Sequence, residues 1–179
     1  MNLRFPFALF VLLTFATSLS MAGDADQLDE PLKPFAPLLG KTWKGEFKSS
    51  TPDRPLFDVS RWERALNGKA VRVLHSVNDG VYGGETIIVW DAQKNSLVYW
   101  YFTTAGFRTE GTMKYEDGQW SAQEVVIGAA GGITEVKSTT KLLPDGRLRV
   151  TAEYLKDGKW DAGREVDYQK APDARVVFK

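Results

Sequence analysis

Turn dipeptides that contain glycine recur along most of the chain at a nearly regular spacing. They are Asn67-Gly68, Asp79-Gly80, Asp117-Gly118, Asp145-Gly146 and Asp157-Gly158. Asn-Gly and Asp-Gly suit the two central positions of a tight β-hairpin, because both residues accept a positive φ angle. With the turn-like segments 91–95, 105–106 and 129–132, these turns follow one another about every twelve to fourteen residues. That interval equals one strand plus one tight turn, so it constrains the chain to a succession of antiparallel hairpins.

The segments between the turns are rich in β-branched and aromatic residues and alternate in polarity, as strands do. We expect roughly ten strands, at residues 42–48, 56–66, 69–77, 85–91, 97–104, 108–115, 119–128, 133–143, 147–155 and 164–170. Residues 28–40 contain three prolines and can hold only a short helical turn. We predict an all-β fold, an antiparallel up-and-down β-barrel of about ten strands, because closure removes exposed strand edges. A two-sheet sandwich is the alternative, but sandwiches usually need long crossover connections, and none is visible here.

The N-terminal segment has the character of a secretory signal peptide. A short basic start precedes the apolar or small residues 5–20, and Ser20 and Ala22 fit a signal-peptidase site. Pro6 and the short apolar length argue against a transmembrane helix. We expect residues 1–22 to be cleaved, residues 23–40 to close the barrel and residues 41–179 to form one barrel domain. The mature protein, without a membrane span, is then exported, to the periplasm in a bacterium or otherwise out of the cell.

Composition excludes several kinds of chemistry. The chain has no cysteine, which removes thiol nucleophiles, thiolate metal sites and redox motifs. Lys+Arg and Asp+Glu both number 23, so no excess of positive charge favours a nucleic-acid partner. The single histidine, His75, stands among scattered carboxylates without the ligand spacing of a zinc or calcium site. We therefore expect no metal, no cofactor and no nucleic-acid partner, and we assign no catalytic residue.

The stretch PLKPFAPLLGKTWKGEF resembles the opening of calycin-type barrels. A loop ending in Leu-Leu-Gly precedes Trp43 on the first expected strand, and Gly-Glu follows, with one more residue between Gly40 and Trp43 than the usual Gly-x-Trp. The stretch is similar to lipocalin-like bacterial domains of unknown function and to nitrobindin-like barrels. The resemblance implies that Pro- and Leu-rich residues close one end, that the Trp packs at the barrel base, and that a small, largely apolar ligand binds inside. For nitrobindin-like members it would imply haem on a histidine near the C-terminus, which this chain lacks.

The sequence LVYWYF carries aromatic side chains on both faces of an expected strand, because successive side chains of a strand alternate. We expect Trp100 and Phe102, with Trp90 from the preceding strand, to form an aromatic wall inside the barrel. Tyr99 and Tyr101 suit the wetter face, where a hydroxyl can reach water. Simple core packing is the alternative reading of each of these rings. An uncovered outer face would form an interaction patch.

Three polar residues are further candidates for a ligand site. His75 shares a strand face with valines, where it either faces a cavity as a ligand-binding or acid–base group or is half-buried against a neighbouring strand. Thr104 and Arg108 flank the small turn at 105–106, and a cavity mouth there would let Arg108 pair with a carboxylate or phosphate. A surface arginine is the alternative.

Three glutamates, Glu85, Glu110 and Glu124, lie on adjacent expected strands, and Arg108 shares a face with Glu110. Such a cluster would orient a polar group of a ligand or abstract a proton. An exposed ladder of cross-strand ion pairs is the alternative.

The sequence thus leaves three classes of function open. The first is an exported binding protein that holds a small hydrophobic or amphipathic molecule in the barrel, as a monomer or homodimer. The second is an envelope structural or interaction module with a filled barrel and an exposed aromatic face. The third is an enzyme that uses His75, for which no nucleophile or cofactor motif is present.

Overall fold

The computed structural model describes residues 27–179, and the expected signal peptide at 1–22 lies outside the described residues. The elements in chain order are the 3-10 helix η2 (Glu30–Leu38), β1 (Lys41–Phe47), β2 (Phe57–Ala65), the 3-10 turn η3 (Leu66–Gly68), β3 (Ala70–Val77), the 3-10 turn η4 (Asn78–Gly80), β4 (Tyr82–Asp91), β5 (Ser96–Thr103), β6 (Arg108–Glu116), β7 (Gln119–Ile127), β8 (Ile133–Leu142), β9 (Leu148–Lys156) and β10 (Lys159–Lys170). Within this part of the chain, no helix has both the length and the apolar character that crossing a membrane requires.

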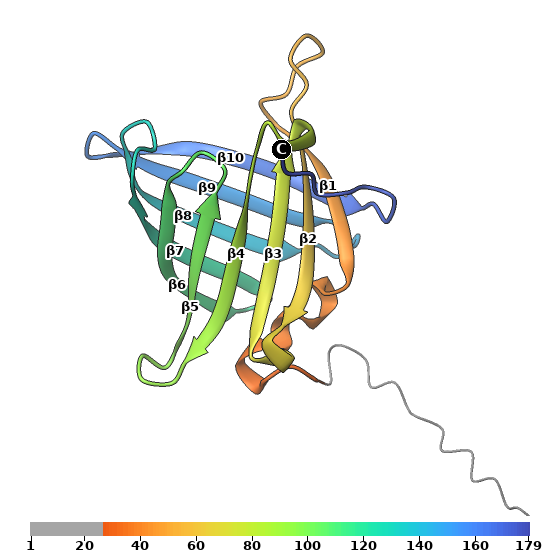
Figure 1. The fold of residues 1–179 in the computed structure, drawn as a ribbon, viewed down its shortest axis with the longest axis vertical. Helices are drawn as coiled ribbons and strands as arrows, with labels where there is room; N and C mark the ends of the chain where they lie inside the picture. Colours follow the sequence, from red (N-terminus) through yellow and green to blue (C-terminus); the bar gives the residue numbers. More distant parts are fainter. Residues whose placement is uncertain (1–26) are drawn as a thin grey trace, which may run out of the picture.

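The ten strands form one closed, antiparallel barrel (Figure 1). Each strand pairs with its neighbours in the sequence, and β1 pairs with β10 to close the sheet, with Gly45 opposite Tyr168. The prediction of an up-and-down barrel preceded by a short helical turn is confirmed, and the sandwich alternative is wrong. The largest difference from the expected strands is at β10, which begins at Lys159 rather than at residue 164.

The turn dipeptides explain where the chain reverses. Asp117-Gly118 and Asp157-Gly158 form two-residue hairpins, and all four residues have positive φ, between 50° and 76°. Asn67-Gly68 and Asp79-Gly80 lie instead in η3 and η4, where both members again have positive φ. The dipeptides therefore mark the reversals correctly, although not every one is a two-residue hairpin.

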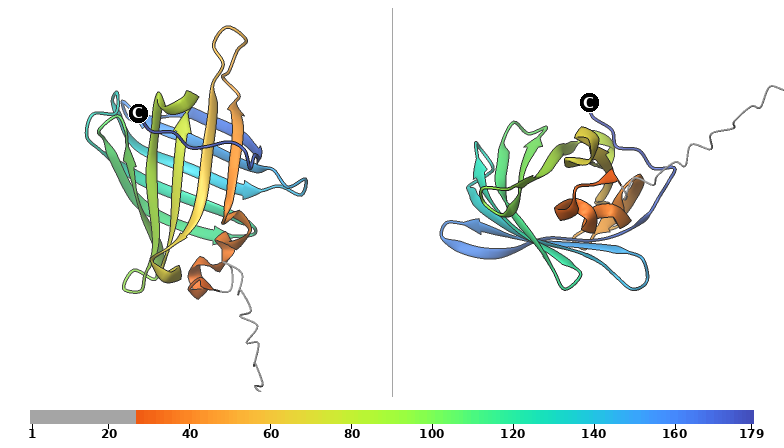
Figure 2. Two further views of the ribbon diagram at one scale, coloured as in Figure 1. Left: turned by 45° about the vertical axis from the view of Figure 1, so that its right-hand side comes forward. Right: turned by 90° about the horizontal axis from the view of Figure 1, so that it is seen from below.

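The helix η2 lies across one end of the barrel, which is seen from below in Figure 2. Its buried side chains are Leu32, Phe35 and Leu38. They recur every third residue, which is the period of a 3-10 helix and places them on one face. The prolines of the segment have the same spacing and lack the backbone N–H that an α-helix needs, so the sequence favours the tighter helix. We call this end of the barrel the plugged end.

The hydrophobic core gathers at the plugged end. The ring of Phe35 stacks against Trp62 and Trp120, with centroid distances of 5.9 and 5.1 Å. Trp43 on β1 is fully buried, and its indole N–H donates to the carbonyl of Leu38 at 3.4 Å. The same cluster includes buried aliphatic residues from β3, β4, β5, β9 and β10.

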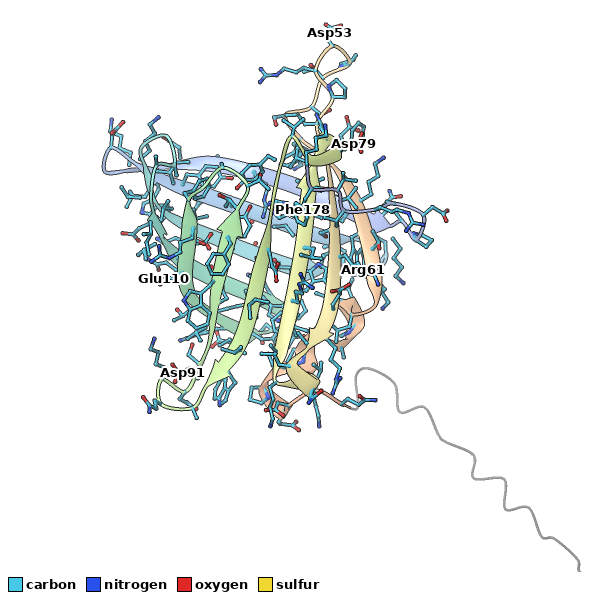
Figure 3. All side chains as sticks on the ribbon, in the orientation of Figure 1. Asp53, Arg61, Asp79, Asp91, Glu110 and Phe178 are labelled. Atoms are coloured by element: carbon cyan, nitrogen blue, oxygen red, sulfur yellow. The ribbon has the colours of Figure 1, made fainter. Side chains whose placement is uncertain are left out.

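The chain beyond β10 crosses the outer surface of the barrel near its other end (Figures 1 and 3). The Val177 N–H donates to Ser76 Oγ at 3.0 Å, and Phe178 lies against Gly83. Ser76 points out of the barrel on β3, and the tail buries it to 2% exposure. The C-terminal residues therefore cover the outside of β3 and β4.

Phe35→Ala should destabilise the protein by about 3–5 kcal/mol, because the change removes a fully buried ring from between two tryptophans. Urea unfolding followed by tryptophan fluorescence measures the change. Val81→Ala is the control, since Val81 is 76% exposed and should change stability by less than about 0.5 kcal/mol. A loss for Phe35→Ala as small as that of the control would show that η2 does not anchor the core.

Candidate functional site

The barrel encloses a cavity of about 540 Å³, which is within the range of small-molecule sites. Its walls are mainly apolar. Trp62, Ile88 and Leu148 line it toward the plugged end, and Phe107, Ala130 and Ile133 line it toward the opposite end. The cavity therefore extends from the core under η2 to the β5–β6 and β7–β8 connections.

The tyrosines of β5 line this cavity, and its other two aromatic residues do not. Tyr99 and Tyr101 are cavity residues, whereas Trp100 and Phe102 are 37% and 50% exposed on the outside. The expected interior row of Trp100 and Phe102 is wrong. Trp90 points inward but packs against the core at the plugged end rather than lining the cavity.

A chain of hydrogen bonds runs along one wall of the cavity. The buried carboxylate of Asp58 contacts His75 Nδ1 at 3.0 Å, and His75 Nε2 contacts the Tyr101 hydroxyl at 2.7 Å. The Tyr101 hydroxyl also contacts the Tyr82 hydroxyl at 2.8 Å. The other oxygen of Asp58 accepts from the Tyr168 hydroxyl at 2.5 Å. An ionised Asp58 only accepts, so in the neutral form of the ring Nδ1 carries the proton and Nε2 accepts from Tyr101.

Glycines on intervening strands make room for these tyrosines. Gly45 on β1 lies opposite both Asp58 and Tyr168, which bond to each other across it. A methyl group on Gly84 would lie 2.4 Å from the Tyr101 ring, which leans across β4 toward His75. A methyl group on Gly45 would lie 2.5 Å from Val166 Cγ1 and 3.1 Å from the Tyr168 ring, so a side chain at either glycine would displace this wall of the cavity.

Glu124 forms a second polar centre in the cavity. Thr109 Oγ1 donates to its carboxyl at 2.5 Å, and Tyr99 also bonds to it from β5 across Gly111. Burial raises the pKa of Glu124 above its ordinary value, and the hydrogen bonds from Thr109 and Tyr99 oppose the shift only in part. Glu124 therefore keeps its proton to a higher pH than an exposed glutamate does.

Arg164 lines the cavity beside a β-bulge in β10. The register shifts between Ala162 and Glu165, where Gly163 and Arg164 lie opposite the single residue Ala152 of β9. Arg164 follows the inward alternation of Val166 and Tyr168, and the one extra residue reverses the alternation before it, so Ala162 is exposed. Gly163 is needed there, because a methyl group on it would lie 2.6 Å from the Tyr154 ring. Burial lowers the pKa of Arg164, but the neighbouring oxygens of Tyr168 and Asp58 raise it further, so the guanidinium is charged.

The structure separates the other expected site residues from the cavity. Arg108 is exposed on the outside of β6, and Thr104 Oγ1 accepts from the Gly83 N–H at 3.0 Å. Glu85 forms a bidentate ion pair with Arg72 on the outer face, at 2.9 and 3.1 Å. Glu110 also points outward (Figure 3). Of the polar candidates, only His75 and Glu124 face the cavity.

Asp58, Tyr168 and Arg164 are among the polar cavity residues that the sequence did not single out. Asp58 and Tyr168 belong to expected strands, and each shares a strand face with apolar residues. Arg164 shares the strand face of Val166 and Tyr168 on the expected strand 164–170, so the same signal was present for it.

A comparison of the chain with protein-family models and with curated proteins finds no match. Among residues 27–179, no three His, Asp or Glu side chains lie close enough together to hold a metal ion. The chemical character of the site follows from its geometry. It is an apolar chamber whose described walls carry a histidine–tyrosine chain that ends on the buried carboxylate of Asp58, a second carboxyl group, Glu124, and one charged guanidinium.

The neutral ring of His75 should carry its proton on Nδ1, because Asp58 accepts there and Tyr101 donates to Nε2. Nitrogen chemical shifts of the imidazole, measured on untagged protein, test this directly, since the chain has one histidine. Tyr101→Phe removes the donor to Nε2 and should shift its resonance, whereas Tyr115→Phe on the exposed surface should not. A neutral ring protonated on Nε2 would contradict the arrangement.

Glu124→Gln should stabilise the protein at neutral pH. The raised pKa means that the folded state holds a proton that the unfolded state releases, so stability falls as pH rises above the ordinary value of 4.5. Glutamine cannot ionise, so the stability advantage of the variant should grow from about pH 4 to about pH 8. Melting temperatures across that range measure it, with Glu116→Gln at the exposed end of β6 as the control. An advantage that did not change with pH would refute the burial argument.

Proposed function

We propose that this protein is an exported binding protein that holds a small amphipathic molecule inside its barrel. The observation that carries the proposal is the cavity of about 540 Å³, whose walls are mainly apolar and carry a few convergent polar groups. Apolar walls favour any apolar molecule of suitable size, whereas fixed polar groups select orientation and identity. This combination is typical of binding sites rather than of a packed core.

The same observation weighs against a structural module with a filled barrel. Packed protein interiors leave few voids larger than a water molecule, and a chamber of this size departs from that rule. The outer face with Trp100 and Phe102 does not require a filled interior, so it is compatible with binding as well.

Catalysis by His75 is the weaker alternative. Both ring nitrogens are engaged, by Asp58 and by Tyr101, so a free base facing a substrate is lacking in this arrangement. Hydrogen bonds of this kind fix the orientation of a ring as well as they activate it.

We further propose a place for the protein among calycin-like barrels. The Leu-Leu-Gly–Trp opening and the closed meander of ten strands support this proposal together. The signal-peptide character of residues 1–22 supports export, to the periplasm if the source is a bacterium.

Native mass spectrometry of the mature protein, purified after export and never unfolded, tests the binding function. We expect an added mass that disappears on denaturation. Ser138→Phe fills the cavity from β8 and should lower the bound fraction, whereas Ser121→Phe on the outer face should leave it unchanged. Equal occupancy in the two variants, or no bound mass and no uptake of added amphipathic molecules, would contradict the proposal.

A further inference from the structure

Arg164 lines the cavity and has no hydrogen-bond or ion-pair partner among residues 27–179. Its side chain is half-buried, and the guanidinium faces the cavity. A guanidinium carries five N–H donors, and leaving them unpaired away from bulk water is costly. The group therefore offers its donors to an acceptor held in the cavity.

The hydroxyl groups around the cavity do not pair with the guanidinium, since none of them is hydrogen-bonded to it in the described chain. Tyr168 donates instead to Asp58, Tyr101 to His75 and, in the same direction along the chain, Tyr82 to Tyr101. Among the described residues that line the cavity, Arg164 is the one arginine or lysine.

The two carboxyl groups that face Arg164 do not neutralise it by contact. Both oxygens of Asp58 are occupied, by His75 and by Tyr168, and no carboxylate oxygen lies within 4.0 Å of the guanidinium in the described chain. Glu124 also faces it, but burial favours the protonated form of that residue. Asp58 therefore acts on the guanidinium only from beyond contact distance, and the N–H donors of Arg164 stay directed into the cavity.

The course of β10 also directs Arg164 into the barrel. Arg164 continues the inward alternation of Val166 and Tyr168, and the bulge at Gly163 ends that alternation, since Ala162 beyond it is exposed. Bulges are enriched beside binding and active sites. An arginine without a hydrogen bond or ion pair in the described chain thus occupies the last inward position before the bulge.

We propose that Arg164 binds the carboxylate of an amphipathic acid whose apolar part lies against Trp62, Ile88 and Leu148. This inference rests on the proposed binding function and specifies the class of ligand. A carboxylate matches the planar fork of a guanidinium through two parallel N–H···O bonds. The apolar part then fills the chamber toward the plugged end, where the walls carry few polar groups.

Calorimetric titration of delipidated mature protein with three amphiphiles that share one tail tests the proposal. The probes are dodecanoate, dodecanol and dodecyltrimethylammonium, which carry an anionic, a neutral and a cationic head. Dodecanoate should bind at least about tenfold more tightly than dodecanol, because hydrogen bonds to a charged partner are the strong ones. The cationic probe should bind most weakly.

Arg164→Gln should remove the preference for the acid while leaving dodecanol binding within about twofold. Arg164→Lys keeps the charge without the fork and should retain part of the preference. Arg108→Gln is the matched control, since the same substitution on the outer face should change nothing.

The outcomes separate the two proposals. Equal affinity of the wild type for dodecanoate and dodecanol, or an undiminished preference in folded Arg164→Gln, overturns the carboxylate subsite and leaves the binding function standing. No binding of any probe overturns both. The comparison of head groups in the wild type needs no variant, so it decides the matter even if Arg164→Gln does not fold.

Discussion

The pairing of β1 with β10 is the constraint on which the rest of the structure depends. It joins the ends of a meander of ten strands, so every barrel strand has two neighbours and no free edge remains among them. Closure also divides each strand into an inner and an outer row of side chains. At the plugged end, the inward side chains pack against η2 and fill the barrel. Toward the opposite end they leave the space that forms the cavity.

Inside that space, buried hydroxyl groups need partners, and the barrel supplies them by pairing tyrosines with glycines. Tyr168 reaches Asp58 across Gly45, and Tyr101 leans over Gly84 to reach His75. Because glycine has no side chain, the side chains of the two strands that flank it can reach each other over it. The result is a polar wall in which distant parts of the sequence hold one another in place.

The sequence predicted the barrel well, because turn chemistry and strand alternation are local properties. It did not predict which face of β5 points inward, since that strand is aromatic on both sides. Trp100 and Phe102 are apolar enough for an interior, but the tyrosines fit there because the partners of their hydroxyls, His75 and Glu124, lie on the same inner wall two strands away. Alternation with Val166 and Tyr168 could have placed Arg164 on the inner face, but the bulge before it could not be predicted, because a bulge changes the parity of a strand without changing its composition. His75 was placed correctly on a face with valines, while its partner Asp58 required the register between β2 and β3.

The pairing of β1 with β10 also determines when the barrel can be completed during synthesis. The contact between Gly45 and Tyr168 joins positions near the two ends of the described chain, and such long-range contacts slow folding because the intervening loop must be closed first. A nascent chain that lacks its last strand has an unsealed sheet and an incomplete core, since Val166 and Tyr168 are part of that core. If the chain crosses a membrane before it folds, as the proposed export requires, this delay is an advantage, because the final strand to emerge is the one that completes the barrel.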